Sequence, residues 1–433
     1  MPNPNAPSMA NGVISSTLSP TVGSPTIISS VIANTAPDQA LNDVNSMQVL
    51  PSGTVAADGS AIVSFNTLAA SSLTIGSGIS GLTAKNTLHL RAGLANVRSG
   101  LAPLKIAFVG DSTTLGFGGG GSLDTGGKAA SYPTRFSQIL TGRGIPSQTD
   151  SWFGQGAVSG NYSLYNPLVT VLSGFTADVG IQTVGAAGFK STATGSVLSF
   201  APVAAFDTMD IFTLNNAGLG SFTVNVDGGA TLATVNTSAG GTYVKNTVSC
   251  SLGIHTINCT TTSNSYTNIA GIAVRASGTP RVECYNMGWD SSAAGQWASP
   301  STWSPIQGLA TIAPNVTFIN LTINDINSTS ALNANYTNYL QTIITQSLST
   351  GDAILMIGNP CNNSKWTTGS PSLANQYGNV VYALAQSNNI QLVDITQRFS
   401  SFASWNSVAP YYDTLHPGAL GYADIAAALS LIF

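Results

Sequence analysis

The chain has 433 residues, of which 43% are hydrophobic but only 7% are charged, far below the roughly 25% of ordinary soluble proteins. Small, hydroxyl-bearing and amide-bearing residues replace the charged ones, as is typical of β-rich extracellular or virion-surface proteins, and the length leaves room for two or three domains. A formal net charge of -4, and the lack of any apolar run near about 18 residues, argue against partners such as nucleic acid or a membrane.

The first part of the chain, residues 1–100, reads as an N-terminal extension. Residues 1 to about 50 are rich in Pro, Ser, Asn and Ala without a sustained period, which predicts a low-complexity tail that is flexible or ordered only by a partner. The start has neither the basic region nor the apolar core of a secretory signal, so we expect an extracellular or virion-associated protein that is delivered by another route. A hairpin is possible at 55–65, and the extension could promote oligomers. From Ser80 a helical stripe predicts a helix that packs on the next domain: Leu82, Leu88, Leu90, Leu94 and Val97.

An α/β domain is expected to begin after this extension. The apolar run Ile106–Val109 ends at Gly110 and predicts a buried parallel strand. The glycines of Gly116–Gly121 are not followed by the Gly-Lys-Ser/Thr of a phosphate-binding loop, so we interpret them as a mobile rim. A helix is then predicted from Ser131 through Leu140.

Residues 178–281 have a different sequence pattern, with short β segments separated by turns and no helical period. This pattern predicts a β-sandwich inserted into the α/β domain, which would comprise 101–177 and 282–433. The predicted strands of the insert are Ser196–Phe200, Met209–Leu214, Ser221–Val226, Thr231–Val235, Tyr243–Cys250, His255–Thr260 and Ile269–Arg275.

After residue 281 strands and helices alternate again, which predicts a doubly wound sheet of five strands. The further strands are Val282–Tyr285, Val316–Leu321, Ala353–Ile357 and Ile390–Val393, and the helices are Ala331–Leu348, Ser372–Gln386 and Ala419–Leu431.

The four cysteines show no CxxC pair, which argues against a zinc site. Cys250 and Cys259 flank a hairpin-like segment and could form a disulfide, or could be two buried thiols. Nothing in the sequence calls for a metal or an organic cofactor.

A serine, a histidine and an aspartate are the candidate catalytic residues. Ser112 follows the first strand at its carboxyl end, where ligands bind in open α/β sheets. A serine hydroxyl needs an adjacent base that is itself held by a third group. Of the three histidines, His89 falls in the N-terminal helix and His255 in the β module, so both are interpreted as structural. His416 remains, with Asp413 three residues before it to orient the imidazole.

Two further acids, Asp111 and Asp325, are interpreted as structural. We expect Asp111 to cap the turn before Ser112 and Asp325 to tie loops together.

With Gly110-Asp111-Ser112 near the first strand and Asp413-x-x-His416-Pro417 near the C-terminus, the chain resembles the SGNH (GDSL-type) hydrolases. The resemblance covers about 101–175 and 282–433. It implies a three-layer α/β/α, flavodoxin-like domain and an esterase or lipase activity, which many members direct at acetylated carbohydrates.

The same resemblance implies an oxyanion hole made by the amides of Ser112 and Ser291 and by the side chain of Asn324. The family's second block has an Asn followed five residues later by a Gly, and here Asn286 is followed by Ser291, with Gly288 as a competing assignment. The third block, normally Gly-x-Asn-Asp, begins here with Thr322.

The hypothesis from the sequence is therefore a serine esterase that uses an acyl-enzyme, with an O-acetylated polysaccharide as its substrate. The inserted β module suggests the carbohydrate, as do Trp289, Trp297 and Trp303, which we expect to be exposed. Two alternatives stay open: a general lipase or carboxylesterase, and a catalytically silent glycan-binding surface or virion protein.

Overall fold

The computed structural model describes residues 86–122, 125–154, 162–178, 183–185, 188–398 and 401–432, together with three two-residue strands. The chain divides into two compact units, Met1–Ile75 and Gly76–Phe433. In the first unit, β1 (Met9–Ala10) pairs with β2 (Val13–Ile14) in antiparallel fashion. The rest of the predicted tail and the possible hairpin at 55–65 lie outside the described residues.

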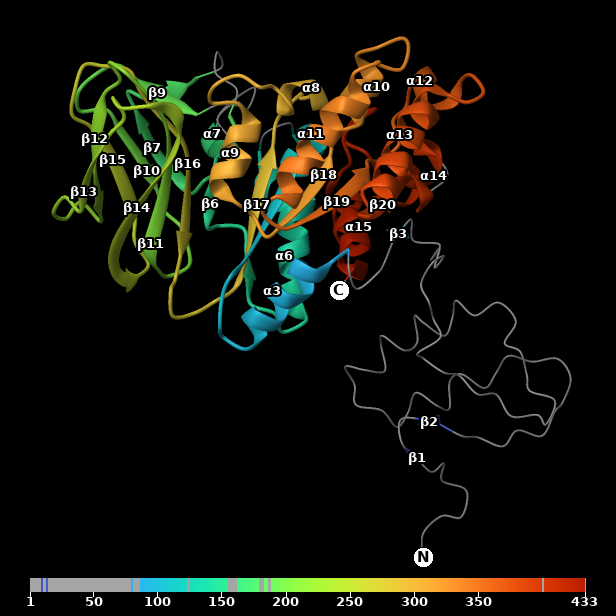
Figure 1. The fold of residues 1–433 in the computed structure, drawn as a ribbon, viewed down its shortest axis with the longest axis horizontal. Coiled ribbons are helices and arrows are strands. Elements are labelled where there is room, and N and C mark those ends of the chain that lie inside the picture. Colours follow the sequence, from blue (N-terminus) through green and yellow to red (C-terminus); the bar gives the residue numbers. More distant parts are fainter. Residues whose placement is uncertain are drawn as a thin grey trace, which may run out of the picture. The chain divides into compact units, whose positions relative to one another are not determined.

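A seven-stranded sheet forms the centre of the α/β domain, with the order β3-β20-β19-β18-β4-β17-β5 (Figure 1). Six of its strands are parallel and only β3 is antiparallel. Without the two-residue β5, the spatial order of the parallel strands counted along the chain is 2-1-3-4-5, which is that of a doubly wound sheet. The mixed α/β architecture with a parallel sheet is confirmed, while the flavodoxin-like label stays a prediction. The strands are β3 (Ile79–Ser80), β4 (Leu104–Gly110), β5 (Ser147–Gln148), β17 (Val282–Gly288), β18 (Val316–Asn320), β19 (Asp352–Ile357) and β20 (Gln391–Asp394).

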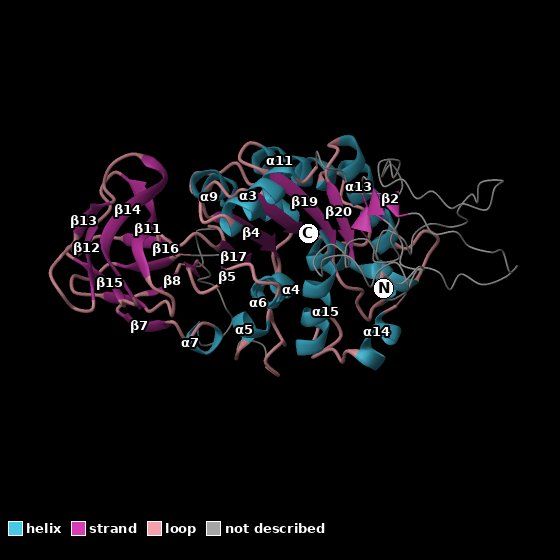
Figure 2. Ribbon diagram, turned by 90° about the horizontal axis from the view of Figure 1, so that it is seen from below, coloured by secondary structure: helices cyan, strands magenta, loops and turns pink. Residues whose placement is uncertain are grey.

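Both faces of this sheet are buried. Since successive side chains of a strand point to opposite sides, each strand contributes to both. In β4, Ile106 and Phe108 pack in a cluster with residues of α6 and α15, whereas Ala107 and Val109 pack in a second cluster with residues of α9, α11 and α13 (Figure 2). The near-continuous apolar strands that the sequence predicted follow from this double burial. The longer helices are α3 (Leu88–Arg98), α6 (Tyr132–Gly142), α9 (Pro305–Ile312), α11 (Tyr336–Leu348), α13 (Leu373–Ser387) and α15 (Ala419–Leu429).

Helix α3 confirms most of the stripe predicted before residue 100. Leu90, Leu94 and Val97 are buried in the cluster that also holds Ile106. Leu88 was assigned wrongly to this stripe, since it is the first residue of the helix and is 57% exposed. Leu82 lies outside the described residues.

The β module consists of two antiparallel sheets with the orders β13-β12-β15-β10-β7 and β14-β11-β16-β9-β8, and β6 also pairs with β16. Because β6, β7 and β8 precede residue 178, the module draws on residues before the predicted boundary. The strands are β6 (Trp152–Phe153), β7 (Val169–Ser173), β8 (Thr176–Ala177), β9 (Phe189–Ser191), β10 (Val197–Phe200), β11 (Phe206–Asn216), β12 (Ser221–Val226), β13 (Ala233–Asn236), β14 (Gly241–Gly253), β15 (Ile257–Thr261) and β16 (Thr267–Arg275).

The sheet that contains β11 and β16 is apolar on both faces. Met209 and Ile211 of β11 pack in the core between the two sheets, whereas Phe212 and Leu214 belong to the cluster of the α/β domain. Because successive side chains of a strand point to opposite faces, residues 209 and 211 lie on one face of the sheet and residues 212 and 214 on the other. The module and the α/β domain therefore share a hydrophobic core.

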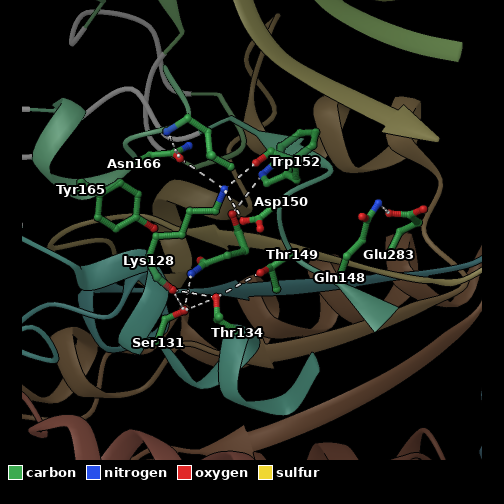
Figure 3. Close-up of polar contacts among 12 residues, drawn as sticks. Lys128, Ser131, Thr134, Gln148, Thr149, Asp150, Trp152, Tyr165, Asn166 and Glu283 are labelled. Carbon is green, nitrogen blue, oxygen red and sulfur yellow. Dashed lines mark hydrogen bonds and ion pairs between the residues drawn. The ribbon is translucent and has the colours of Figure 1, made fainter. Parts of the chain in front are cut away.

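Polar contacts around Lys128 join the two parts at a second place (Figure 3). Lys128 lies on α5 (Gly127–Ala130), and its Nζ donates to the carbonyl oxygen of Trp152 at 3.2 Å and to Oδ1 of Asn166 at 3.4 Å. The carboxylate of Asp150 is 3.9 Å from the same nitrogen. Burial lowers the pKa of Lys128 to about 8, because desolvation disfavours the charged amine.

The possible disulfide between Cys250 and Cys259 is not formed, because all four cysteines are free. Cys250 lies on β14 and Cys259 on β15, which belong to different sheets of the module.

We predict that Phe212→Ala destabilises the whole unit. Phe212 is 2% exposed and contacts the rings of Trp152 and Tyr243 at centroid distances of 5.9 and 6.2 Å. Truncating a buried phenylalanine lowers the free energy of unfolding by about 3–5 kcal/mol, and a shared core passes this loss to both parts. Denaturant unfolding followed by fluorescence and circular dichroism measures it. The exposed Val203→Ala is the control, and separate transitions of which only one shifts would contradict the shared core.

Candidate active site

Ser112 occupies a tight turn at the carboxyl end of β4. The strand ends at Gly110, Asp111 is the N-cap, and Ser112 begins the one-turn helix α4 (Ser112–Leu115). A Cβ atom at Gly110 would lie 1.9 Å from Oγ1 of Thr114, so only glycine allows the chain to turn this closely. Ser112 is 3% exposed.

The interpretation of Asp111 as a cap agrees with its hydrogen bonds. Its Oδ1 accepts from the amide of Thr113 at 2.8 Å and from the Thr113 hydroxyl at 2.7 Å. Its Oδ2 is buried without a hydrogen-bond partner. Burial raises the pKa of Asp111 to about 6, although the bonds from Thr113 act in the opposite direction.

Ser112, His416 and Asp413 lie in a hydrogen-bonded line, although 301 positions of the sequence separate Ser112 from Asp413. The distance between Ser112 Oγ and His416 Nε2 is 2.9 Å, and His416 Nδ1 is 2.8 Å from Asp413 Oδ2. These are the distances expected of a nucleophile with its base and of a base with its orienting acid. The structure thus brings the three predicted residues together.

The loop that carries His416 is fixed from several sides. Oδ1 of Asp413 accepts from the amides of Leu415 and His416, each at 2.7 Å. Partial burial acts to raise the pKa of Asp413, but the bonds from His416 and from these amides outweigh it, so the pKa lies below its usual value. The ring of Phe117 meets the imidazole edge-on at a centroid distance of 5.8 Å.

Phe117 belongs to the glycine-rich segment that was interpreted as a mobile rim, and this interpretation is wrong for its first half. Gly116–Gly119 are buried, and a Cβ atom at Gly118 would lie 2.5 Å from Cβ of Tyr412. The carbonyl oxygen of Phe117 also accepts from the Tyr422 hydroxyl at 2.6 Å. The glycines therefore allow close packing that places Phe117 against His416.

Each of the two candidate amide donors, Ser291 and Gly288, already has an acceptor. The amide of Gly288 donates to Oδ1 of Asn286 at 2.9 Å and that of Ser291 to the Asp290 carboxylate, so only the backbone conformation favours Ser291. Ser291 has a φ of 60°, in the left-handed region that favours glycine, and this accounts for the family's glycine at that place.

Two polar residues, Asn324 and Asp290, are bonded to the segment that contains Ser291 and Ser292. Asn324 lies on α10 (Ile323–Asn327), and its Nδ2 donates to the carbonyl oxygen of Ser292 at 3.0 Å. Burial raises the pKa of Asp290, although the hydrogen bond from the Ser291 hydroxyl, the charge of His416 and the bond from the Ser291 amide act to lower it. An oxyanion would therefore compete with the Asp290 carboxylate for the amide of Ser291.

Asp325 holds the start of α8 (Ala294–Trp297), as its structural role requires. Its carboxyl oxygens accept from the amide of Ala294 at 3.0 and 3.3 Å, and burial raises the pKa of Asp325 to about 7.

The two other histidines each have a carboxylate partner away from Ser112. His89 Nδ1 is 2.9 Å from Asp352 Oδ1, and His255 Nδ1 is 2.6 Å from Asp227 Oδ2.

The expectation that three tryptophans are exposed is wrong. Trp297 is fully buried, Trp289 is 7% exposed, and the indole nitrogen of the half-buried Trp303 donates to the carbonyl oxygen of Asn215 at 3.1 Å. These side chains belong to the hydrophobic core or pack against it.

Three residues near the site were missed by sequence reasoning: Phe117, Asp290 and Asn320. Nδ2 of Asn320 donates to the hydroxyls of Thr113 and Thr114 at 3.3 and 3.4 Å, which links the end of β18 to the helix of Ser112. The sequence did carry a signal for Asn320, which is a polar residue at the end of an apolar strand. Such a residue lies at the edge where neighbouring parallel strands end and ligands bind.

No family model and no curated protein matches the chain. Among solved structures, a peptidoglycan O-acetylesterase aligns over 81% of this chain and 97% of its own, with 16% identity and a TM-score of 0.60. A family two carbohydrate esterase from Clostridium thermocellum covers 56% of this chain and 93% of its own, with 13% identity and a TM-score of only 0.28. The chain therefore shares its fold with this peptidoglycan O-acetylesterase.

This fold explains why the site is assembled from distant parts of the chain, since the ends of parallel strands and the loops after them meet at one edge of the sheet. Among the residues that the structure describes, no group of three His, Cys, Asp or Glu side chains could hold a metal ion. In the same residues, no helix has the length and apolar character needed to cross a membrane.

We predict that Asp111→Asn gains stability relative to the wild type as the pH rises from about 4 to 6. The pKa of Asp111 is raised in the folded protein, so the native state binds more protons than the unfolded state in this range, and the wild type loses stability with rising pH. Asparagine keeps the acceptor for Thr113 but does not ionise. Urea unfolding of both proteins at several pH values measures the difference.

The control for this prediction is Asp207→Asn. The Ser277 hydroxyl lowers the pKa of Asp207, so the corresponding difference should have the opposite sign and occur below about pH 4. A difference between Asp111→Asn and wild type that is independent of pH would contradict the prediction.

Proposed function

We propose that the protein is a serine esterase that removes O-acetyl groups from a polysaccharide through an acyl-enzyme. The observation that carries this proposal is the hydrogen-bonded line of Ser112, His416 and Asp413, with distances of 2.9 and 2.8 Å. The fold shared with a peptidoglycan O-acetylesterase supports it.

In the first half of the reaction, Ser112 Oγ attacks the ester carbonyl carbon while His416 Nε2 takes the hydroxyl proton. The tetrahedral intermediate collapses as His416 gives that proton to the leaving sugar oxygen, and the acetyl group stays on Ser112. In the second half, His416 takes a proton from water, the resulting hydroxide attacks the acetyl-enzyme, and the proton returns to Ser112 as acetate leaves. Asp413 keeps Nδ1 protonated and stabilises the imidazolium.

The oxyanion would be met by the amides of Ser112 and Ser291 and by the side chain of Asn324. Support comes from the left-handed backbone of Ser291 and from the bond of Asn324 to Ser292, which places both candidates on adjoining segments. The raised pKa of Asp290 makes its carboxylate easier to neutralise than a normal aspartate, and this would free the Ser291 amide for an oxyanion.

The acetylated polysaccharide is the finer part of the proposal. The low charge of the chain suits an extracellular or virion-associated protein that acts on surface glycans. Strong preference for long acyl chains over acetylated glycans would favour the lipase or carboxylesterase alternative.

We predict that Ser112→Ala lowers acetate release by at least about a thousandfold, because the nucleophile of a catalytic triad has no substitute. The measurement compares wild type and variant on p-nitrophenyl acetate and on a panel of acetylated glycans. The exposed Ser301→Ala should retain wild-type rates. Equal background rates in wild type and Ser112→Ala, with glycan binding retained, would establish the silent glycan-binding alternative.

We predict that Asn324→Ala lowers kcat by about 100- to 1,000-fold with a smaller change in KM, as expected for the loss of an oxyanion donor. Asn327→Ala, at the other end of α10, is the matched control because its Oδ1 accepts from Asn363. Equal effects of the two variants would show that Asn324 acts only through folding.

A further inference from the structure

A cavity of about 610 Å³ opens at the carboxyl edge of the parallel sheet, beyond the ends of β19 and β20. Its walls come from α13, from the segment after β19 and from the start of α14 (Phe402–Val408). This volume falls within the range of small-molecule sites. The side chains that give the cavity its character are the aromatic residues Trp366, Tyr382 and Phe402 and the amides Asn375, Asn379 and Gln397.

The packing of α13 against its neighbours does not require a glycine at position 378. Gly378 lies inside the 15-residue helix α13 and lines the cavity, and a Cβ atom there would meet only Cδ1 of Ile357, at an ordinary 3.7 Å. Glycine inside a helix costs about 1 kcal/mol relative to alanine. No close approach of another segment explains this cost, whereas open space for a ligand does.

The charges of the lining select a neutral ligand. Among the described residues that line the cavity, none is Lys, Arg or His. Its carboxylate, Asp394, is 2% exposed and already accepts from Thr396 at 2.5 and 2.9 Å, from the Tyr382 hydroxyl at 2.7 Å and from Gln397 at 3.3 Å. An anionic ligand would have no counter-charge here, while amide and aromatic side chains fit the hydroxyls and the apolar face of a sugar.

The wall of the cavity is bonded to the loop that carries His416. The hydroxyl of Tyr411 donates to the carbonyl oxygen of Pro360 at 2.8 Å, and the Tyr411 ring packs on Phe402 at a centroid distance of 4.5 Å. The amide of Asn362 donates to the carbonyl oxygen of Thr414 at 2.8 Å. The segment that lines the cavity on one side therefore supports the catalytic loop on the other.

We propose that this cavity is a subsite for a neutral sugar residue of the acetylated glycan, which rests on the proposed function. The sugar stacks on the aromatic side chains, and its hydroxyls bond to the amides of α13. Holding this residue positions the chain so that an acetyl ester elsewhere on it reaches Ser112.

The test is Gly378→Leu, which fills the cavity and improves the helix propensity of α13. With acetylated xylan as the neutral glycan, we expect KM to rise by about tenfold or more, while kcat/KM for p-nitrophenyl acetate stays within about twofold because that substrate needs no sugar site. Gly142→Leu is the matched control, since this helical glycine has nothing within 4 Å of its Cβ position and lies outside the cavity. Should Gly378→Leu fail to fold, Asn379→Ala, which truncates an exposed amide of the lining, replaces it.

Unchanged kinetics on acetylated xylan with Gly378→Leu would overturn the subsite. Binding of unacetylated xylohexaose, measured by calorimetry, separates this failure from that of the proposed function. Binding to wild type that is lost in Gly378→Leu supports the subsite even if no ester is hydrolysed, whereas hydrolysis of acetylated xylan with xylohexaose binding equal in both proteins supports only the esterase.

Discussion

The in-register pairing of β4 with its two parallel neighbours is the constraint on which the rest of the site depends. Gly110 lies opposite Gly288 of β17 and opposite Asn320 of β18, so the three strands end on one line. A few residues beyond that line come Ser112, Ser291 and Asn324, each after a different strand. Because parallel hydrogen bonding fixes these ends, the separation of the residues in sequence has no bearing on their separation in space.

The close turn at Gly110 and the packing of Gly288 are part of the same constraint. A Cβ atom at Gly288 would lie 2.1 Å from the amide nitrogen of Leu115, so the one-turn helix of Ser112 rests directly on the end of β17. Asn286 holds this contact with bonds to Leu115 and Ser131 at 3.3 and 3.2 Å. A glycine and an asparagine of β17 thus hold the helix of Ser112 in place.

Local patterns were sufficient to predict the five longer strands of the α/β sheet, the helices α3, α6, α11, α13 and α15, and the serine, histidine and aspartate. Each of these depends on a short apolar period or on the chemistry of a triad. The short strands β3 and β5 and the helix α9 were missed. The exposure of Trp289 and the packing around Phe117 were not predictable in this way, since both depend on which segments meet in space. The start of the β module before residue 178 was missed for a related reason: β8 has two residues and no period of its own, and its pairing with β9 defines it. The left-handed backbone of Ser291, which favours it over Gly288 as the donor, could not be predicted from the sequence either.

Because the sheet that contains β11 and β16 is buried on both faces, the inserted module cannot be regarded as a separable part. A module joined by a linker can be removed or exchanged, whereas here Phe212 and Leu214 fill the same core as Tyr285 of β17 and Leu309 of α9. Removing the sandwich would expose that apolar surface to water and leave the α/β domain prone to aggregate. The word insertion therefore describes only the order of the sequence, because the two parts share one hydrophobic core.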